Sequence, residues 1–410
     1  MTSANLPSPA LFRLVTVAAF ASSISMRICD PMLPALAREF SVGLSAVAPV
    51  IGLFAIAYGL MQLVYGPLGE RFGLFRLTAW ATLLAGLASL LCAATSQLEL
   101  LMLGRMLTGA TAAGIVPLLF AWIGERVPYA LRQVSIARVA GGVALGAVAG
   151  QALGGIMVDT LGWRWAFGVQ AVLLLAPASL MLHLTYRIDN SSTADLKAPT
   201  PLSLMTSWRG YSALLADAWV RRLLLTVGLE GFLFFSALAL LPSALHDRFD
   251  IALWHAGLVT ALYGLGGFSY TAVAPWLLGR LGEIKLVRLG WIGSSLCLLA
   301  LTVAPNWMFA ALILLILGLC FYCQHNTLQT HGTQMAPLRR GFAMACFACV
   351  YFVGQALGVA IASSIVQRIG FSMLFTLVAV ALALLGVSLE AALRQKQGGE
   401  HALGGTTREL

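Results

Sequence analysis

The chain has 410 residues, of which 60% are apolar and only 10% are charged, and its mean hydropathy is +0.88. A soluble domain carries about 25% charged residues, so this composition excludes a soluble globular protein and predicts a chain that crosses a membrane repeatedly. The formal net charge is +9, but the Lys and Arg residues are spread over many short loops without interleaved aromatic side chains, so no nucleic-acid partner is expected.

Twelve apolar segments follow one another along the chain, each close to the length of about 20 residues that a membrane-spanning helix needs. In chain order they are residues 14–36, 45–65, 77–94, 98–122, 134–158, 163–186, 222–245, 254–277, 286–304, 307–330, 342–366 and 371–393. We interpret the first as an uncleaved helix and not as a signal peptide, because further apolar segments follow it rather than a soluble domain. The sequence therefore predicts an all-α membrane protein with twelve transmembrane helices.

One long polar stretch divides these segments into two groups of six. It contains charged residues, two prolines and the pair Arg221 and Arg222, which is typical of a linker. The predicted organisation is an N-terminal six-helix bundle at 1–186, a cytoplasmic linker at 187–221, a C-terminal six-helix bundle at 222–393 and a cytoplasmic tail at 394–410.

The distribution of positive charge predicts the orientation, because cytoplasmic loops carry more Lys and Arg than loops on the other side. With the N-terminus inside, most of the 25 Lys and Arg residues fall on the cytoplasmic side. The opposite side holds Arg38, Arg164, Arg248 and Arg368. We therefore expect both termini to be cytoplasmic, in a multi-pass protein of the cell inner membrane.

The two groups of six segments repeat each other's sequence. The pentapeptide GQALG occurs at residues 150–154 and again at 354–358. The loop at Glu70 and Arg71 is matched by the loop at Arg280, and Pro128 is matched by Pro337, all at nearly the same spacing. A repeated six-helix half with a binding site between the halves is a known transporter architecture.

The loop at residues 66–73 has the sequence GPLGERFG. It resembles the loop signature of the major facilitator superfamily, G-x-L-x-D-R-x-G, with Glu70 in place of the usual Asp and the following basic pair reduced to one Arg. The resemblance implies a conformational latch, and the alternative is that these are ordinary solvated loop charges. The latch residues would be Gly66, Glu70, Arg71, Gly73 and Arg76, with Glu125 and Arg126 on the next cytoplasmic loop as partners.

Three further segments resemble signatures of the same superfamily. Residues 101–113, which contain Arg105, resemble the fourth-helix signature, and the DPMLP sequence at 30–34 resembles the first-helix motif of the twelve-helix drug:proton antiporter family. Residues 146–155 resemble the antiporter signature G-x-x-x-G-P-x-x-G-G, although Gln151 replaces the proline. The resemblance implies a major facilitator fold, and the small residues either pack neighbouring helices or form a gate. The residues in these packing or gating positions are Pro31, Pro34, Gly146, Gly150, Gly154 and Gly155.

A few charged residues lie inside apolar segments, where they are costly and therefore indicate function. Arg27 and Asp30 are three residues apart on one helix face and form either a self-neutralising pair or an acid whose protonation an exchangeable Arg controls. Glu230 has no basic neighbour within its segment, so it is expected to be a proton carrier unless another helix supplies a partner. Arg105 occupies a signature position, and a structural pairing with Asp30 is the alternative.

The tenth segment carries the polar cluster Gln324, His325, Asn326 and Gln329. These side chains either line a central cavity or hydrogen-bond between helices. In the major facilitator superfamily the first, fourth, seventh and tenth helices line the cavity. Four of the five charges inside apolar segments and this cluster lie on these helices, and the fifth charge, Arg138, lies near the cytoplasmic end of the fifth segment. We therefore predict that these four residues, with Arg27, Asp30, Arg105 and Glu230, form the proton-coupling site and substrate cavity.

Two C-x-x-C sequences, at Cys320/Cys323 and Cys346/Cys349, raise the question of a zinc site. Membrane cysteines usually act as small packing residues, so no metal and no cofactor are expected. The sequence also lacks the nucleotide-binding pattern G-x-x-x-x-G-K-[ST] and the hydrolase and metalloprotease motifs, so neither an ATP-driven pump nor an enzyme is expected.

These features predict a secondary active transporter, acting as a monomer, that exports small amphipathic or drug-like compounds in exchange for protons by alternating access. One alternative is a transporter of an organic anion or metabolite, which Arg27 and Arg105 would bind. An alternative of another class is a membrane sensor that transports nothing.

Overall fold

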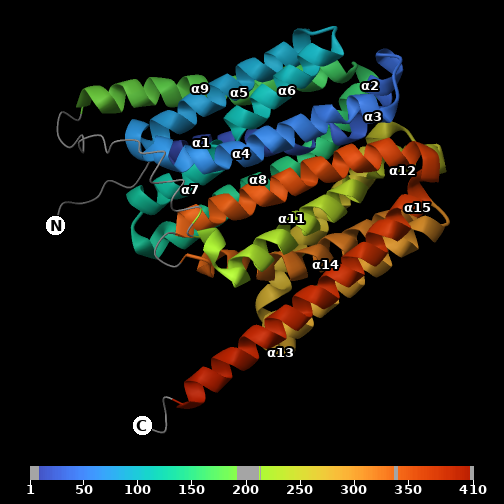
Figure 1. The fold of residues 1–410 in the computed structure, drawn as a ribbon. Coiled ribbons are helices and arrows are strands. Elements are labelled where there is room, and N and C mark those ends of the chain that lie inside the picture. The colour runs from blue at the N-terminus through green and yellow to red at the C-terminus, as the bar shows by residue number, and fades with distance from the viewer. Residues whose placement is uncertain (1–8, 192–211, 213, 337–339, 407–410) are drawn as a thin grey trace.

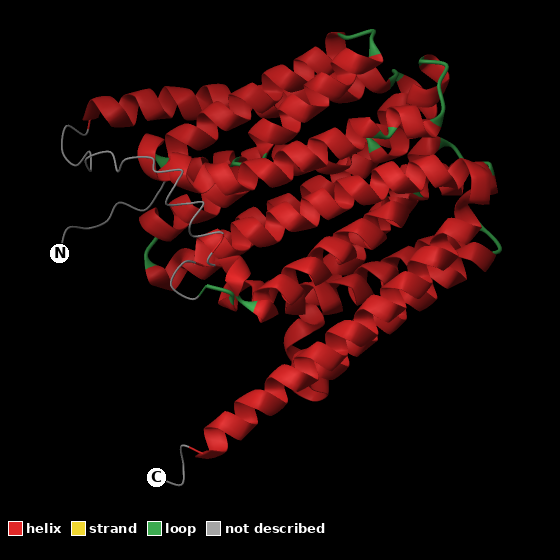
Figure 2. Ribbon diagram, viewed as in Figure 1, coloured by secondary structure: helices red, strands yellow, loops and turns green. Residues whose placement is uncertain are grey.

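The computed structural model describes residues 9–191, 212, 214–336 and 340–406, and within these ranges the chain folds into helices without strands (Figure 2). Within the described residues, ten helical stretches are long and apolar enough to cross a membrane. The structure is therefore that of a multi-pass membrane protein.

Several crossings in the first half of the chain are built from two or more helices. The first, Ala10–Glu39, contains a break at Asp30–Met32, and the fourth, Leu98–Arg126, breaks at Ala113. Pro31 and Pro34 lie at the first break, where they cannot donate a helical hydrogen bond. The elements are α1 (Pro9–Arg27), the 3-10 helix η1 (Asp30–Met32), α2 (Leu33–Glu39), α3 (Leu44–Val47), α4 (Pro49–Phe72), α5 (Leu74–Ala94), α6 (Leu98–Ala112), α7 (Ile115–Arg126), α8 (Tyr129–Thr160) and α9 (Trp163–Ser191).

The second half contains two helices that are much longer than one crossing. The apolar stretches Leu253–Val303 and Gly341–Lys396 have 51 and 56 residues. Each is interrupted by a non-helical glycine, Gly282 with φ 70° and Gly370 with φ 77°, in the region that glycine adopts without strain. The elements are α11 (Ala218–Leu238), α12 (Leu241–Phe249), α13 (Leu253–Val303), α14 (Trp307–Gln334) and α15 (Arg340–Thr406).

The helices on either side of the predicted linker extend further than the apolar pattern indicated. Helix α9 continues to Ser191 rather than ending at 186. Helix α11 begins at Ala218 rather than at 222, because the Asp217 side chain accepts hydrogen bonds from the Trp219 and Val220 backbone N–H groups. Most of the linker, residues 192–211, lies outside the described residues.

The repeated pentapeptide performs the same packing task in both halves. Gly150 and Gly154 of α8 lie against the backbone of α1, where a Cβ would crowd the carbonyl oxygens of Ile24 and Ile28. Gly354 and Gly358 of α15 lie against α11 in the same way, at the carbonyl oxygens of Gly228 and Phe232. The small residues therefore allow close backbone approach in both places.

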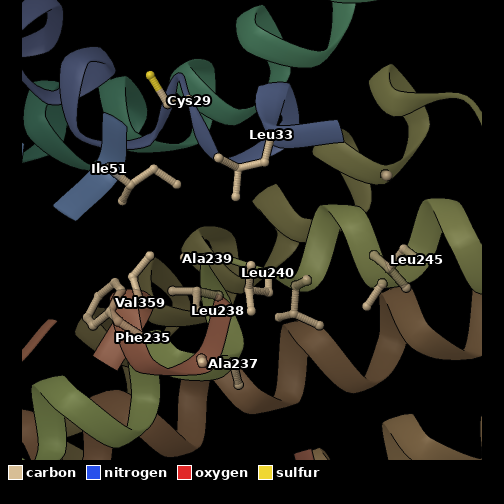
Figure 3. Packing of buried hydrophobic residues seen from close by; sticks show 14 of the residues in the cluster. Cys29, Leu33, Ile51, Phe235, Ala237, Leu238, Ala239, Leu240, Leu245 and Val359 are labelled. Carbon is tan, nitrogen blue, oxygen red and sulfur yellow. The ribbon is translucent and has the colours of Figure 1, made fainter. Parts of the chain in front are cut away.

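The two halves meet along two helix pairs, α4 with α15 and α8 with α13 (Figure 1). A continuous apolar cluster crosses this boundary, and Figure 3 shows Leu33 and Ile51 of the first half above the segment that contains Leu238. A hydrogen bond also joins the halves, because the Asp159 carboxylate accepts from the Trp254 backbone N–H over 2.7 Å. This contact places a carboxylate at the N-terminal end of α13, where the helix dipole favours negative charge.

Candidate functional site

Asp30 lies fully buried at the break between α1 and α2. Its Oδ2 accepts a 2.8 Å hydrogen bond from the Gln151 side-chain amide and lies 3.6 Å from Arg27 Nη1. Its other oxygen, Oδ1, has no hydrogen-bond partner among the described residues. The site therefore combines a buried acid, one ionic partner and one uncharged donor, with one oxygen left to bind something else.

Arg105, on α6, is equally buried but makes no ion pair with Asp30. Its guanidinium donates to the backbone oxygens of Ser25 over 2.9 Å and of Val50 over 3.2 Å, and it lies 4.2 Å from the Phe54 ring centre. From the sequence, a direct pairing of Arg105 with Asp30 was an alternative, and the described structure does not contain this pairing. Arg105 instead connects α6 to α1 and α4, and it is close enough to act on Asp30 electrostatically.

Glu230, on α11, has its partners on α14. The His325 ring nitrogen Nδ1 lies 2.7 Å from Glu230 Oε2, and the Gln324 amide donates to Oε1 over 3.1 Å. From the sequence, Glu230 was expected to have no basic partner within its own helix. In the structure its basic partner, His325, comes from another helix. Gln324 and His325 reach Glu230 where α14 contacts α11.

His325 is surrounded by aromatic rings. It stacks on Phe321 with centres 5.1 Å apart and contacts Tyr351 at 4.9 Å. Tyr351 also meets the Phe235 ring edge to face, with ring centres 5.7 Å apart, and Tyr263 lies beside the Phe234 ring at 5.4 Å. The Glu230 site is therefore an acid paired with an imidazole whose ring is surrounded by aromatic side chains.

Arg27 connects the two acidic sites across the boundary between the halves. Its guanidinium lies over the Phe235 ring, 4.2 Å from the centroid, while it also pairs with Asp30 in its own half. A cation over an aromatic face is stabilised by up to about 2 kcal/mol when desolvated. Any movement that separates the halves at this level must break this contact.

The remaining predicted residues of α14 lie differently from the first two. Asn326 is half-buried and interacts with the Tyr270 side chain, whereas Gln329 is exposed. Of the four polar residues, the structure thus brings two to Glu230, places one against α13 and leaves one at the surface of the protein.

The predicted latch residues are only partly described. Gly66 and Gly73 have open space around them, and Gly73 has a φ of 84° at the end of α4. The side chain of Glu70 lies outside the described part of the structure. Arg71 lies over the neighbouring Phe72 ring, and among the described side chains no ion pair joins it to Glu125.

The predicted packing residues Gly146 and Gly155 also touch backbone. Gly146 lies against Phe20 of α1, whereas Gly155 lies against Leu253 and Trp254 of the other half. Gly155 is therefore an inter-half contact and not only a packing residue within its own half.

Two of the four cysteines of the C-x-x-C sequences, Cys323 and Cys346, belong to different apolar clusters. Cys323 packs with Tyr270 and Leu286, whereas Cys346 packs with Leu224. All seven cysteines of the chain are buried.

Three residues of the site were not predicted as such. Gln151 was noted only as a departure from a proline, yet it is the hydrogen-bond donor to Asp30. Tyr351 and Phe235 lie in apolar segments rich in aromatic residues, and no sequence signal separates them from ordinary packing residues.

Comparison with known proteins places this geometry in a family. The sequence pattern described as Major Facilitator Superfamily matches residues 15–339 of the chain. The chain belongs to the major facilitator superfamily. Its sequence is 27% identical over 401 residues, covering 94% of this chain and 92% of the relative, to the uncharacterized MFS-type transporter YwfA of Bacillus subtilis.

Other similarities of this major facilitator transporter concern parts of the chain or the fold alone. It is 26% identical to the multidrug export protein EmrB of Escherichia coli K12 over 169 residues, which cover 41% of this chain and 33% of EmrB. A crystal structure of a mutant of the nucleoside transporter NupG superposes with a TM-score of 0.70 at 13% identity, covering 92% of this chain and 99% of NupG. At that identity the similarity supports the fold and not the substrate.

Proposed function

We propose that this transporter exchanges protons for small amphipathic or drug-like compounds, with Asp30 and Glu230 as the proton carriers. The observation that supports this most strongly is the Glu230 site. A carboxyl that is 1% exposed is hydrogen-bonded to the His325 imidazole, whose ring contacts aromatic side chains that suit an amphipathic molecule. The partial similarity to a protein named as a multidrug exporter agrees with export.

In the proposed mechanism each acid exists in two environments. Desolvation favours the neutral carboxyl, whereas an approaching cation favours the carboxylate. When Arg27 leaves Phe235 and turns fully to Asp30, or when His325 is protonated beside Glu230, the acid releases its proton. A substrate that displaces these partners has the same effect in reverse, so substrate binding and proton binding become linked.

The topology belongs to the same proposal. We infer twelve crossings, because the long helices α13 and α15 each contain a glycine break and each have the length of two crossings. On this view both termini lie in the cytoplasm, the first six and last six crossings form separate bundles, and the monomer acts in the inner membrane.

The test is transport in proteoliposomes with an imposed pH gradient, using Asp30→Asn and Glu230→Gln. Both changes keep the shape and remove the charge, so pH-driven accumulation should be lost while substrate binding is retained in part. If the two variants, singly and together, still move substrate against its gradient using pH alone, the carriers lie elsewhere.

An organic anion is the second candidate substrate, and one observation favours it. Arg105 Nη1 is buried without a hydrogen-bond partner among the described residues. A guanidinium donor of this kind suits a carboxylate. Competition between a panel of cationic and anionic compounds for binding, with Arg105→Lys as the variant, separates this candidate from the first.

The proposed cytoplasmic latch is tested separately. Glu70→Ala should slow transport with little effect on the melting temperature, because position 70 lies at the end of α4 near the aqueous phase. Normal turnover in a well-folded Glu70→Ala variant would show that the latch signature has no role in this protein.

A further inference from the structure

A small cavity lies beside Glu230, on the side away from the aromatic rings. It offers about 10 Å³ to the centre of a water molecule, which is close to the room that one buried water requires. Neither His325 nor Tyr351 lines it. Its polar walls are Thr226, Glu230 and Gln324, and its apolar wall is formed largely by Leu382, Leu385 and Leu389 of the last crossing.

The polar groups around this cavity suit a water molecule. Thr226 lies one turn before Glu230 on α11, and its hydroxyl donates to the Arg222 carbonyl oxygen over 2.8 Å. The hydroxyl oxygen keeps its lone pairs for another donor. A water in the cavity therefore has the Thr226 hydroxyl, the Glu230 carboxyl and the Gln324 amide as partners, within the two to four that a buried water commonly has.

The cavity lies next to a cluster of charged side chains in the last crossing and its neighbours. Leu389 lines it, and the next residue, Glu390, is paired with both Arg288 and Arg394. Arg222 lies near the same cluster, since it donates to the Ser388 carbonyl oxygen over 3.1 Å. Between Glu230 and this ion-paired cluster the described structure thus places one polar cavity and a wall of leucines.

We propose that this cavity is a water-binding site through which the proton reaches and leaves Glu230, behind α11 and apart from the boundary between the halves where substrate binds. The inference rests on the proposed role of Glu230 as a proton carrier. It adds a route and two residues, Thr226 and Leu389, that the coupling role does not itself require.

The proton transfer along this route balances without a further reactant. The Glu230 O–H bond breaks, a lone pair of the water takes the proton, and the hydronium ion passes it to solvent at the end that holds Glu390. Gln324 and His325 hydrogen-bond the carboxylate that remains. His325 stacks on Phe321 and contacts Tyr351, and none of these three residues lines the cavity.

The test uses the separation between the proton route and the substrate-binding side of Glu230. Thr226→Val keeps the branched shape and removes the hydroxyl, and Leu389→Phe fills the cavity. In proteoliposomes with an entrapped pH dye, each should slow substrate-linked proton release by about tenfold or more. This is less than the roughly 100-fold or greater effect of removing a proton-transfer group itself, because each variant disturbs only the water beside that group. Substrate counterflow, which exchanges substrate without net proton movement, should stay within about twofold of the wild-type rate, because the binding groups on the aromatic side are intact.

The chain provides a matched control and a rescue variant. Thr185 has the same 8% exposure as Thr226 and donates to its own i−4 carbonyl over the same 2.8 Å, but in the first half of the chain. Thr185→Val should therefore leave proton release unchanged, and Thr226→Ser should restore it.

The outcomes separate this route from the coupling role of Glu230. If Glu230→Gln abolishes pH-driven transport while Thr226→Val and Leu389→Phe release protons at the wild-type rate, the route is wrong and the carrier assignment stands. If the Glu230→Gln variant still transports substrate against its gradient with the pH gradient as the sole driving force, both the route and the assignment of Glu230 as a proton carrier are wrong. Loss of counterflow together with proton release in Thr226→Val and Leu389→Phe would also overturn a separate route.

Discussion

The two halves of this transporter use one packing scheme but place their acids differently. In the first half α8 lies against Ile24 and Ile28, and in the second half α15 lies against Gly228 and Phe232, in the same register. In that register Glu230 corresponds to Met26 and Asp30 corresponds to Phe234. The acids are thus four residues out of step, about 6 Å along a helix.

The partners of the two acids differ as well. Asp30 is held by an Arg, which stays charged, and by the amide of Gln151. Glu230 is held by a His, a residue type that changes charge around neutral pH. The repeat therefore supplies the same scaffold to both halves, whereas the partners of the two acids differ: an Arg and an amide for Asp30, and a His and an amide for Glu230.

Glu230→Gln should have the largest effect on this comparison. If the second half carries the pH-sensitive site, the variant should lose at least about 100-fold in pH-driven transport, the scale of a removed proton-transfer group. Initial rates in proteoliposomes under an imposed gradient measure this. Glu99→Gln, at the start of α6, is the control and should run normally; equal losses in the two variants would show a general effect of removing acidic charge.

Gly154→Ala and Gly358→Ala test whether the packing is truly shared. Each Cβ would be forced against a carbonyl oxygen of the neighbouring helix, so each should lower the free energy of unfolding by about 1–3 kcal/mol. Thermal melting in detergent measures this. Gly168→Ala, which has open space at its Cβ, should not destabilise, and a loss confined to one of the two repeat positions would break the symmetry of the scaffold.

Gln151→Leu and Gln355→Leu compare the same repeat position where the halves differ. The Gln151 amide donates to Asp30, a bond to an ionisable group worth about 1.5–3 kcal/mol. The Gln355 side-chain oxygen is buried without a partner among the described residues. We expect Gln151→Leu to slow transport about tenfold or more and Gln355→Leu to leave it near the wild-type rate. If Gln355→Leu slowed transport more than Gln151→Leu, the glutamine of the second half would be the one that transport depends on.

Asp159→Ala should have the smallest effect. It removes one hydrogen bond between the halves, from the Trp254 N–H, and the loss of such a cap is worth about 1 kcal/mol. The equilibrium between conformations should shift about fivefold away from the one in which α8 and α13 touch at this end, as spin-label or fluorophore distances between the halves would record. An unchanged distance distribution would show that Gly155 and the apolar cluster hold this end closed without the cap.

The membrane architecture was predictable because it depends on composition. Runs of apolar residues, the repeat of GQALG and the loop at 66–73 each carry information in the sequence itself, and the family match confirms the superfamily. The boundaries at Ser191 and Ala218 were not predictable from hydropathy, since α9 continues through polar residues and α11 starts at a side-chain cap.

The site was predictable only in part, for a physical reason. A charge in an apolar run is conspicuous, so Asp30 and Glu230 stood out as single residues. Their partners depend on how distant helices rotate against one another, which no local pattern records. Three contacts therefore became evident only from the structure. Gln151 donates to Asp30, His325 pairs with Glu230, and Arg105 donates to a backbone oxygen instead of pairing with Asp30.

The glycine at position 370 has a consequence for how the protein is made. It reverses the chain within α15 (Figure 1) with only a few polar side chains beside it, among them Gln367 and Arg368. The two apolar stretches on either side are therefore joined by a connection too short to form a separate loop. We expect the pair to enter the bilayer as one hairpin, and a side chain at position 370 to lower the amount of protein that reaches the membrane more than the turnover of the molecules that do.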